Sequence, residues 1–321
     1  MLFNLIENID METVYFIGIL FSIAATFLML GKFNGFLPKD QGKEFAVGGM
    51  ASKGKIRGAG ISFIIVYCVA VALFSKLNVE ICIYTALVFA AMLTGYLDDA
   101  AEVPWGRLKK GLLDLFISIA TAVTYIYYNG TKILIATANI KVTIPPVIMG
   151  ILIIILVWAA INVTNCSDGI DGLCGTLCII TLSTIYAMDK IFKIDDGFNY
   201  TILLMIIVIL VYLWYNAPDS TILMGDAGSR SLGLFIAIAM LKSGAPIMYL
   251  LVSIVLIVDG GLGLFKVSFI KVFKKNPMPN VITPVHDQYK KKSGWVNTQV
   301  VYRFSIIQII FSIIAIYLCI K

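Results

Sequence analysis

The chain has 321 residues, of which 60% are hydrophobic and only 14% are charged, with a net charge of +6. A water-soluble domain cannot bury so much apolar side chain, so the composition excludes a soluble protein and favours a polytopic membrane protein. The six cysteines show no paired C-x-x-C spacing, and there is a single histidine. These counts leave no zinc cluster, and we interpret the cysteines as small apolar residues.

Apolar segments predict about ten transmembrane helices, since a helix needs about 20 mostly apolar residues to cross the hydrocarbon core. The segments are residues 13–31, 58–75, 79–96, 111–128, 144–161, 173–191, 199–214, 231–241, 246–269 and 300–320. The first lacks a basic leader and a cleavage site, so it is predicted to span the membrane rather than to be a signal peptide. The eighth is short, and Asp259 and three glycines interrupt the ninth.

The distribution of Lys and Arg predicts the sidedness of the bundle. Alternate loops carry seventeen basic residues on one side and seven on the other. Cytoplasmic loops carry the excess of basic residues, so both termini are expected outside. No linker or repeat divides the chain, and residues 1–321 are expected to form a single all-α membrane domain.

Two adjacent acids, Asp98 and Asp99, end the third apolar segment on the basic side. Carboxylates at a membrane boundary are costly unless they are solvated or paired, and they are functional candidates by default. An ordinary charged helix cap is the alternative.

A polar run on the same side places Asn162, Asn165, Asp168 and Asp171 at every third position. A straight α-helix has 3.6 residues per turn and cannot direct all four side chains to one site. A helix end or a tighter turn could, and the glycines at 169 and 172 supply the necessary conformational freedom. The alternative is a purely structural turn.

Residues 215–229 contain Asn216, a proline expected to end the seventh helix, and Asp226 between Gly225 and Gly228. We expect a loop here, running into the short eighth helix. Backbone amides and an acid in such a loop can approach phosphate or Mg²⁺, which binds through one or two carboxylates together with substrate phosphates.

Basic residues and the lone histidine complete the candidate site. Lys53, Lys55 and Arg57 lie in a glycine-rich stretch before the second segment, where they either anchor the chain at the membrane or clamp a diphosphate. His286 lies in the most basic loop, and it has either a structural or a functional role.

Taken together, the paired aspartates, the N-x-x-N-x-x-D-G-x-D-G run, the M-G-D-x-G-S loop and the P-x-H element resemble the polyprenyl-phosphate N-acetylhexosamine 1-phosphate transferases. The P-x-H element is most similar to the phospho-N-acetylmuramoyl-pentapeptide transferase family, which makes the first lipid-linked intermediate of bacterial peptidoglycan. That family usually carries three consecutive histidines where this chain has His286, Asp287 and Gln288, so only His286 is carried over. Leu223 replaces the aromatic residue often found before M-G-D.

The resemblance implies a Mg²⁺-dependent transfer from UDP-N-acetylmuramoyl-pentapeptide to undecaprenyl phosphate at the bacterial cytoplasmic membrane, with release of UMP. It implies that Asp226 holds the metal and that Asp98, with Asp99 beside it, deprotonates or orients the lipid phosphate. The other implied catalytic residues are Asp168, Asn216 and His286. The implied substrate-binding residues are Lys53, Lys55, Arg57, Lys110, Asn162, Asn165 and Asp171. Whether an aspartate first forms a covalent intermediate is left open.

Two other functions are considered. A sister transferase that uses UDP-N-acetylglucosamine would account for Asp259, which is otherwise interpreted as a buried acid bonded to the backbone of the broken helix. A secondary transporter would place its acids near the bilayer midplane between repeats, whereas here they lie on one face. The expected partners are membrane lipids and no nucleic acid, and the resemblance also suggests a homodimer.

Overall fold

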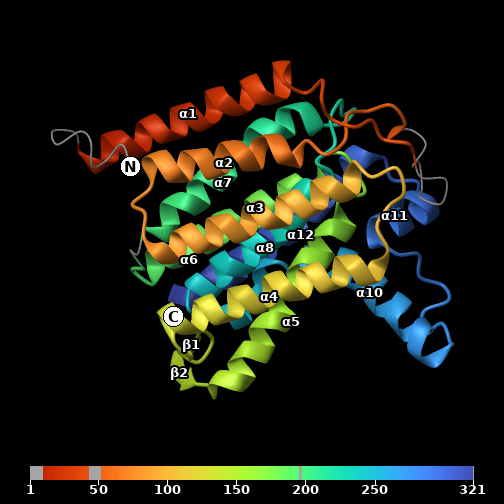
Figure 1. The fold of residues 1–321 in the computed structure, drawn as a ribbon. Helices are drawn as coiled ribbons and strands as arrows, with labels where there is room; N and C mark the ends of the chain where they lie inside the picture. Colours follow the sequence, from red (N-terminus) through yellow and green to blue (C-terminus); the bar gives the residue numbers. More distant parts are fainter. Residues whose placement is uncertain (1–9, 43–51, 195–196, 321) are drawn as a thin grey trace.

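Each of the ten expected segments contains a helix in the structure, a computed structural model that describes residues 10–42, 52–194 and 197–320 (Figure 1). The helices are α1 (Met11–Lys32), α2 (Gly60–Phe74), α3 (Val79–Asp99), α4 (Arg107–Asn129), α5 (Pro146–Ser167), α6 (Leu173–Ile191), α7 (Phe198–Asn216), α8 (Gly225–Lys242), α9 (Tyr249–Val252), α10 (Ile254–Phe273), α11 (Val285–Ser293) and α12 (Asn297–Ile320). A 3-10 turn, η3 (Pro246–Met248), precedes α9. A short antiparallel hairpin, β1 (Lys132–Ile135) with β2 (Ile140–Thr143), joins α4 to α5.

Length and apolar composition identify the helices that can cross a membrane. In the part of the chain that the structure describes, seven helices pass this test, namely α1, α3, α4, α5, α6, α7 and α12, and an eighth span arises if the bent segment from Pro246 to Phe273 is counted as one. The outer helices expose large apolar side chains, including Phe16, Phe116 and Ile313. Such an outer surface suits lipid, and the prediction of an all-α polytopic membrane protein is confirmed.

The central helix is α8, which differs from its predicted form. Every residue from Ala227 to Leu241 is buried, because the six helices from α2 to α7 surround the helix. From Leu232 to Leu241 the helix is apolar on all sides, which is typical of a protein interior. The helix begins at Gly225 rather than at residue 231, so the expected loop around Asp226 is wrong. Asp226 instead lies in the first turn of α8.

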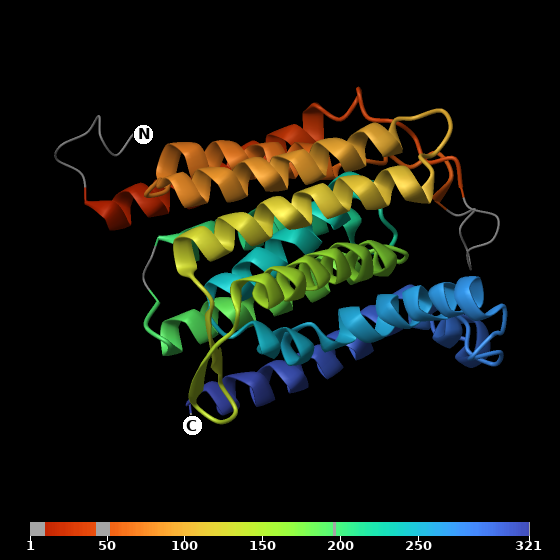
Figure 2. The same cartoon turned by 60° about the horizontal axis from the view of Figure 1, so that its bottom comes forward.

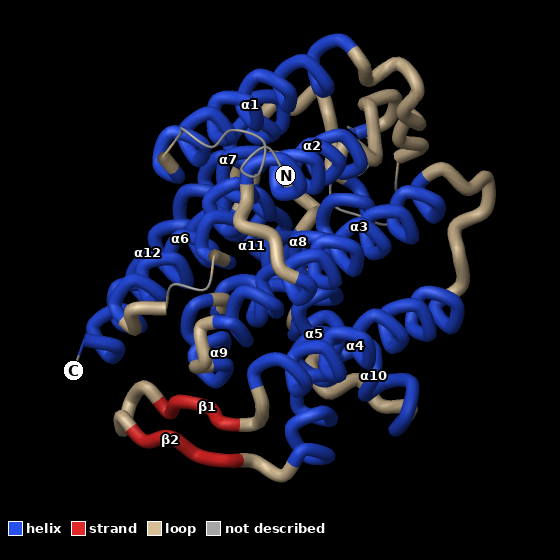
Figure 3. Tube along the Cα trace, turned by 60° about the vertical axis from the view of Figure 1, so that its left-hand side comes forward, coloured by secondary structure: helices blue, strands red, loops and turns tan. Residues whose placement is uncertain are grey.

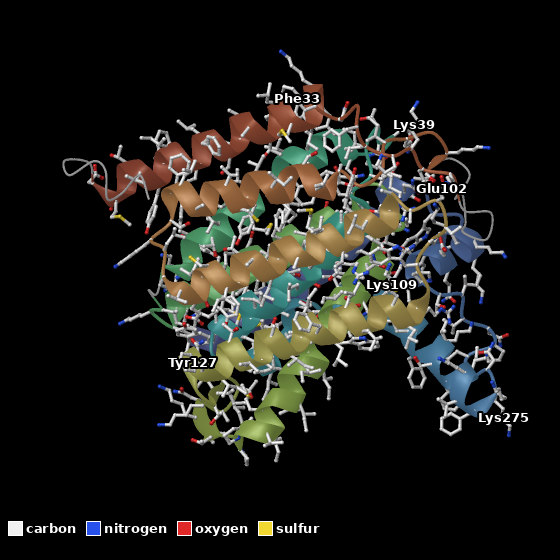
Figure 4. All side chains as sticks on the ribbon, in the orientation of Figure 1. Phe33, Lys39, Glu102, Lys109, Tyr127 and Lys275 are labelled. Atoms are coloured by element: carbon white, nitrogen blue, oxygen red, sulfur yellow. The ribbon has the colours of Figure 1, made fainter. Side chains whose placement is uncertain are left out.

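The loops on the predicted basic side gather at one end of the bundle, which we call the site end. Lys39, Glu102, Lys109 and Lys275 mark this end, and Tyr127 lies at the opposite end (Figure 4). Helix α1 begins and α12 ends at the opposite end, where the β1–β2 hairpin also lies (Figures 2 and 3).

The break in the ninth segment lies elsewhere than predicted. Helix α10 runs unbroken through Asp259 and its neighbouring glycines, and the chain bends by 88° between α9 and α10, at Ser253. A Cβ on Gly260 would lie 2.4 Å from the carbonyl oxygen of Val163. This glycine therefore lets α10 pack closely against α5 rather than breaking the helix.

Candidate active site

Three carboxylates from two helices meet two cations at the site end. We call Asp98, Asp99 and Asp226 the carboxylate cluster. The ammonium of Lys110 pairs with Asp98 and lies 3.1 Å from Oδ2 of Asp226. The guanidinium of Arg57 lies 2.9 Å from Oδ1 of Asp99 and 3.6 Å from Oδ1 of Asp226. The cluster thus unites residues that the sequence separates by more than a hundred positions.

Short backbone pairings bring the basic loop against α8. Ile56 forms bridges with both Lys39 and Ile222, and its carbonyl accepts a hydrogen bond from the N–H of Leu223 at 2.7 Å. Lys55 and Arg57 flank Ile56, and residues two apart in an extended segment point to the same side. Both cations therefore project toward the acids.

Glycines at two helix crossings allow the close approach that the cluster needs. A Cβ on Gly95 would lie 2.4 Å from the carbonyl carbon and oxygen of Asp226, and one on Gly60 would lie 2.0 Å from the nitrogen of Gly228. Backbone cannot move aside as a flexible side chain can. Only glycine therefore lets α2 and α3 touch the start of α8 at these points.

Backbone donors also fix the two adjacent acids. Oδ2 of Asp99 accepts a hydrogen bond from the N–H of Ala227 at 3.1 Å, and Oδ1 of Asp98 accepts one from the N–H of Trp105 at 2.6 Å. Each acid of the pair is therefore held in a different direction, one toward α8 and the other toward the loop before α4. An ordinary helix cap would not account for this arrangement.

A second group of polar residues lies beside the carboxylate cluster and is joined to it by the basic loop before α2. The ammonium of Lys55 lies 3.1 Å from Oδ2 of Asp171 and 3.0 Å from the hydroxyl of Ser220. Asn216 is buried, accepts a hydrogen bond from the N–H of Gly172 at 2.9 Å and donates one to the carbonyl of Ile222 at 2.8 Å. Its amide thus ties the Asp171 turn to the segment before α8.

The polar run is split between a helix end and a turn. Asn162 and Asn165 lie in the last turns of α5, which extends to Ser167 rather than ending at residue 161, and Asp168 caps the helix. Asn165 donates a hydrogen bond to the hydroxyl of Ser229, three residues beyond Asp226, at 2.9 Å. The sequence-based argument that a straight helix could not gather these side chains agrees with this geometry.

His286 is buried and held by Asp259. Oδ2 of Asp259 lies 2.9 Å from Nδ1 of the histidine, and Oδ1 accepts the backbone N–H of His286 at 2.8 Å. Asp259 is therefore bonded to the histidine, and the interpretation that it bonds the broken helix backbone is wrong. The other ring nitrogen faces the 168–172 turn, because a Cβ on Gly169 would lie 2.6 Å from Nε2.

The basic residues differ in how they are placed. Burial lowers the pKa of Arg57, but the carboxylates of Asp99, Asp226 and Asp40 outweigh it and raise that pKa above its ordinary value. The guanidinium is thus always charged. Lys53, in contrast, is exposed at the surface.

The oxygen donors fit a divalent cation that also binds substrate. Lys110 is a single cation shared by Asp98 and Asp226, which shows that two carboxylates can converge on one positive charge. Among the described residues, no three or more His, Cys, Asp or Glu side chains are arranged to hold a metal by themselves. Mg²⁺ needs only one or two carboxylates when phosphates and water complete its shell.

Sequence reasoning missed three charged residues near the cluster. Asp40 lies 3.1 Å from a guanidinium nitrogen of Arg57, and Asp114 forms a buried ion pair with Arg230. Asp40 lies outside every recognised motif. The signal for Asp114 and Arg230 was their spacing, since Asp114 follows Lys110 and Arg230 follows Asp226 by four positions.

Comparison with known proteins agrees with this site. Residues 81–244 match the glycosyl transferase family 4 model. The chain is 34% identical to the phospho-N-acetylmuramoyl-pentapeptide-transferase of Treponema pallidum, over 85% of this chain and 80% of the relative. The chain belongs to this family. Proteins of the same name from Clostridium acetobutylicum and Campylobacter lari are 27% and 26% identical, each over 80% of this chain and over 82% and 78% of the relative.

Membership of the phospho-N-acetylmuramoyl-pentapeptide transferase family confirms the resemblance found in the sequence motifs. The glycosyl transferase family 4 match includes all three acids of the carboxylate cluster and Lys110, but it does not extend to Arg57 or His286. Together with the apolar helices, the relatives identify a multi-pass protein of the bacterial cytoplasmic membrane.

Proposed function

We propose that this chain transfers phospho-N-acetylmuramoyl-pentapeptide from its UDP carrier to undecaprenyl phosphate at the site end, releasing UMP. The observation that carries the proposal is the 34% identity to a phospho-N-acetylmuramoyl-pentapeptide-transferase over most of both chains. The carboxylate cluster, with its two cations, gives that activity a physical location.

The reaction is a phosphoryl transfer. An oxygen of the lipid phosphate attacks the phosphorus that carries the sugar, and the bond from that phosphorus to the bridging oxygen of the diphosphate breaks. The electron pair of that bond leaves on UMP. Such a reaction depends on positioning and charge neutralisation more than on covalent participation of the protein. A variant in which an aspartate attacks first is left open by the geometry.

Arg57 and Lys110 have the chemistry to bind the reacting phosphates. Arginine presents planar pairs of N–H donors to phosphate oxygens, and lysine supplies a compact point charge. In the structure both cations are neutralised by the carboxylate cluster. We propose that the phosphates draw these cations partly away from Asp98 and Asp99, and that Asp98 then accepts a proton from the lipid phosphate or orients it.

The charge balance favours a divalent cation as part of the reacting complex. Asp40, Asp98, Asp99 and Asp226 carry four negative charges against the two positive charges of Arg57 and Lys110. An anionic diphosphate and a lipid phosphate would meet a net negative site. Asp226 is the residue that would hold Mg²⁺, which when bound would neutralise the phosphate oxygens.

The remaining polar groups are proposed to bind the donor. Lys55 and Asp171 would face the nucleotide, and His286, in the first turn of α11, would face the donor beside the 168–172 turn. The excess of basic residues in the loops of the site end favours a cytoplasmic orientation for this end. The suggested homodimer and the contacts with membrane lipids stay predictions.

The test is UMP release by the purified chain with undecaprenyl phosphate, Mg²⁺ and UDP-N-acetylmuramoyl-pentapeptide. We expect release that requires the lipid and stops with EDTA. Parallel reactions contain UDP-N-acetylglucosamine. Release from that donor alone would contradict the proposed substrate and favour a sister transferase with the same chemistry.

A further inference from the structure

A second ion pair joins α4 to α8, one helical turn further into the bundle than the carboxylate cluster. Asp114 follows Lys110 by four residues on α4, and Arg230 follows Asp226 by four residues on α8. Nη2 of Arg230 lies 2.5 Å from Oδ1 of Asp114, and the two side chains are only 4% and 5% exposed. Neither residue has a role in the chemistry proposed above.

The two helices carry these charges in opposite order. Helix α4 has a cation and then an anion, whereas α8 has an anion and then a cation. Side chains four residues apart on a helix are neighbours, so Lys110 has Asp114 beside it and Asp226 has Arg230 beside it. The charge of Asp226 also acts on Asp114 across the helix contact.

Asp114 could therefore compete for Lys110, and Arg230 could compete for Asp226. Without Arg230, the Asp114 carboxylate would attract Lys110 away from Asp98 and Asp226. Without Asp114, the Arg230 guanidinium would attract Asp226. Pairing with each other removes both competitors at once.

Stability alone gives a weak reason for this pair. Replacing a buried ion pair by well-packed apolar residues is often neutral or stabilising, because two charges must be desolvated. In addition, Nε of Arg230 is buried without a hydrogen-bond partner among the described residues. The arrangement is better explained by what it does to its neighbours.

We infer that Asp114 and Arg230 are a positioning pair that reserves Lys110 and Asp226 for the active site. This inference rests on the proposed function in that it takes the carboxylate cluster as the site of transfer. It assigns neither residue a contact with substrate.

Four variants of the full chain in lipid nanodiscs test the inference: R230M, D114N, the neutral double variant D114N/R230M and the exchanged double variant D114R/R230D. The readouts are kcat and KM for UMP release per folded protein, the melting temperature, and the position of the Lys110 ammonium in a cryo-EM structure of R230M. The matched controls are E80Q, K242M and their double variant, because Glu80 and Lys242 form a buried pair between α3 and α8 at the opposite end, 3.0 Å apart.

We expect each single variant to lose about tenfold or more in kcat, since a lone buried charge seeks the nearest partner. The neutral double variant should recover to within about threefold of the unmutated chain, because it contains neither competitor. The exchanged variant restores an ion pair but places like charges four residues apart on each helix, so it should stay slow even where its melting temperature recovers. The Lys110 ammonium in R230M should lie closer to Asp114 than to Asp226.

A purely structural bridge would give a different pattern. In that case kcat would follow melting temperature in all variants, the exchanged variant would be at least as active as the neutral one, and Lys110 would keep its place in R230M. The control variants E80Q, K242M and their double variant should have a lower melting temperature but an unchanged kcat. If the unmutated chain released no UMP from any donor, the proposed function would fail, while the Lys110 position in R230M would still decide the inference.

Discussion

Gly95 offers a direct test of the close packing that forms the carboxylate cluster. In Gly95→Ala the added Cβ would lie 2.4 Å from the carbonyl carbon and oxygen of Asp226 and 2.6 Å from the nitrogen of Ala227. These atoms are backbone, so no side-chain rotation relieves the clash. Ordinary contact begins at 3.4 Å, so α3 and α8 must separate by about 1 Å.

The separation acts on the site because Asp98 and Asp99 follow Gly95 by one helical turn. The 3.1 Å hydrogen bond from Ala227 to Asp99 would lengthen to about 4 Å and break. Overpacking costs about 1 to 3 kcal/mol, and the better helix propensity of alanine returns up to about 1 kcal/mol. A misplacement of about 1 Å can cost about 100-fold in rate, so activity should fall far more than stability.

The assay measures kcat for UMP release together with the melting temperature. Gly150→Ala is the matched control, since its Cβ would meet only the Cδ1 atom of Ile126 at an ordinary 3.7 Å. The control should keep its activity and gain up to about 1 kcal/mol of stability. A Gly95→Ala enzyme with kcat within about threefold of the unmutated chain would refute the reasoning, because a shift of about 1 Å could not then have occurred.

Three further predictions concern single side chains. Asp226→Asn should lower turnover by about 100-fold or more, because it removes the proposed Mg²⁺ ligand and one of the two carboxylate partners of Lys110. Its melting temperature should stay within a few degrees of that of the unmutated chain. Near-normal turnover would contradict the role of Asp226. Asp259→Asn should lower kcat about tenfold, because a single amide oxygen cannot replace both carboxylate contacts to His286. An unchanged kcat with an unmoved His286 ring would show that Asp259 is not needed to position the histidine. Lys190→Ala, an exposed residue at the end of α6 away from the site end, should leave kcat unchanged, and a large loss would show that the assumed arrangement of the helix ends is wrong.

The helices could be predicted from the sequence because apolar length is a strong local signal. The start of α8 could not. Gly225, Asp226 and Ser229 suggest a loop when they are considered alone, yet they form the first turn of a helix that six other helices surround. Tertiary burial overrides weak local propensity in such a position. The glycines after Asp259 misled in the same way, since they continue the helix and two of them, Gly260 and Gly261, face Val163 of α5.

The motifs of the site could be recognised, but the pairings among them could not. That Asp98 and Asp226 share Lys110 depends on how α3, α4 and α8 cross, and no spacing within one helix shows this. Asn216 illustrates the same limit. Its residue type suggested a polar group near substrate, whereas its amide is used by the backbone of Gly172 and Ile222. Its predicted catalytic role stays a prediction.

Equal spacing on two helices carries information that single motifs do not. Lys110 and Asp226 are 116 residues apart, and so are Asp114 and Arg230. The constant separation means that α4 and α8 run parallel where they meet, both starting at the site end. A slip of one turn in one direction would place Lys110 against Arg230, and in the other direction Asp114 against Asp226. Like charges then meet in a buried contact, at a cost that an apolar contact would not impose. The charge order therefore selects one register, and this register places Lys110 between Asp98 and Asp226.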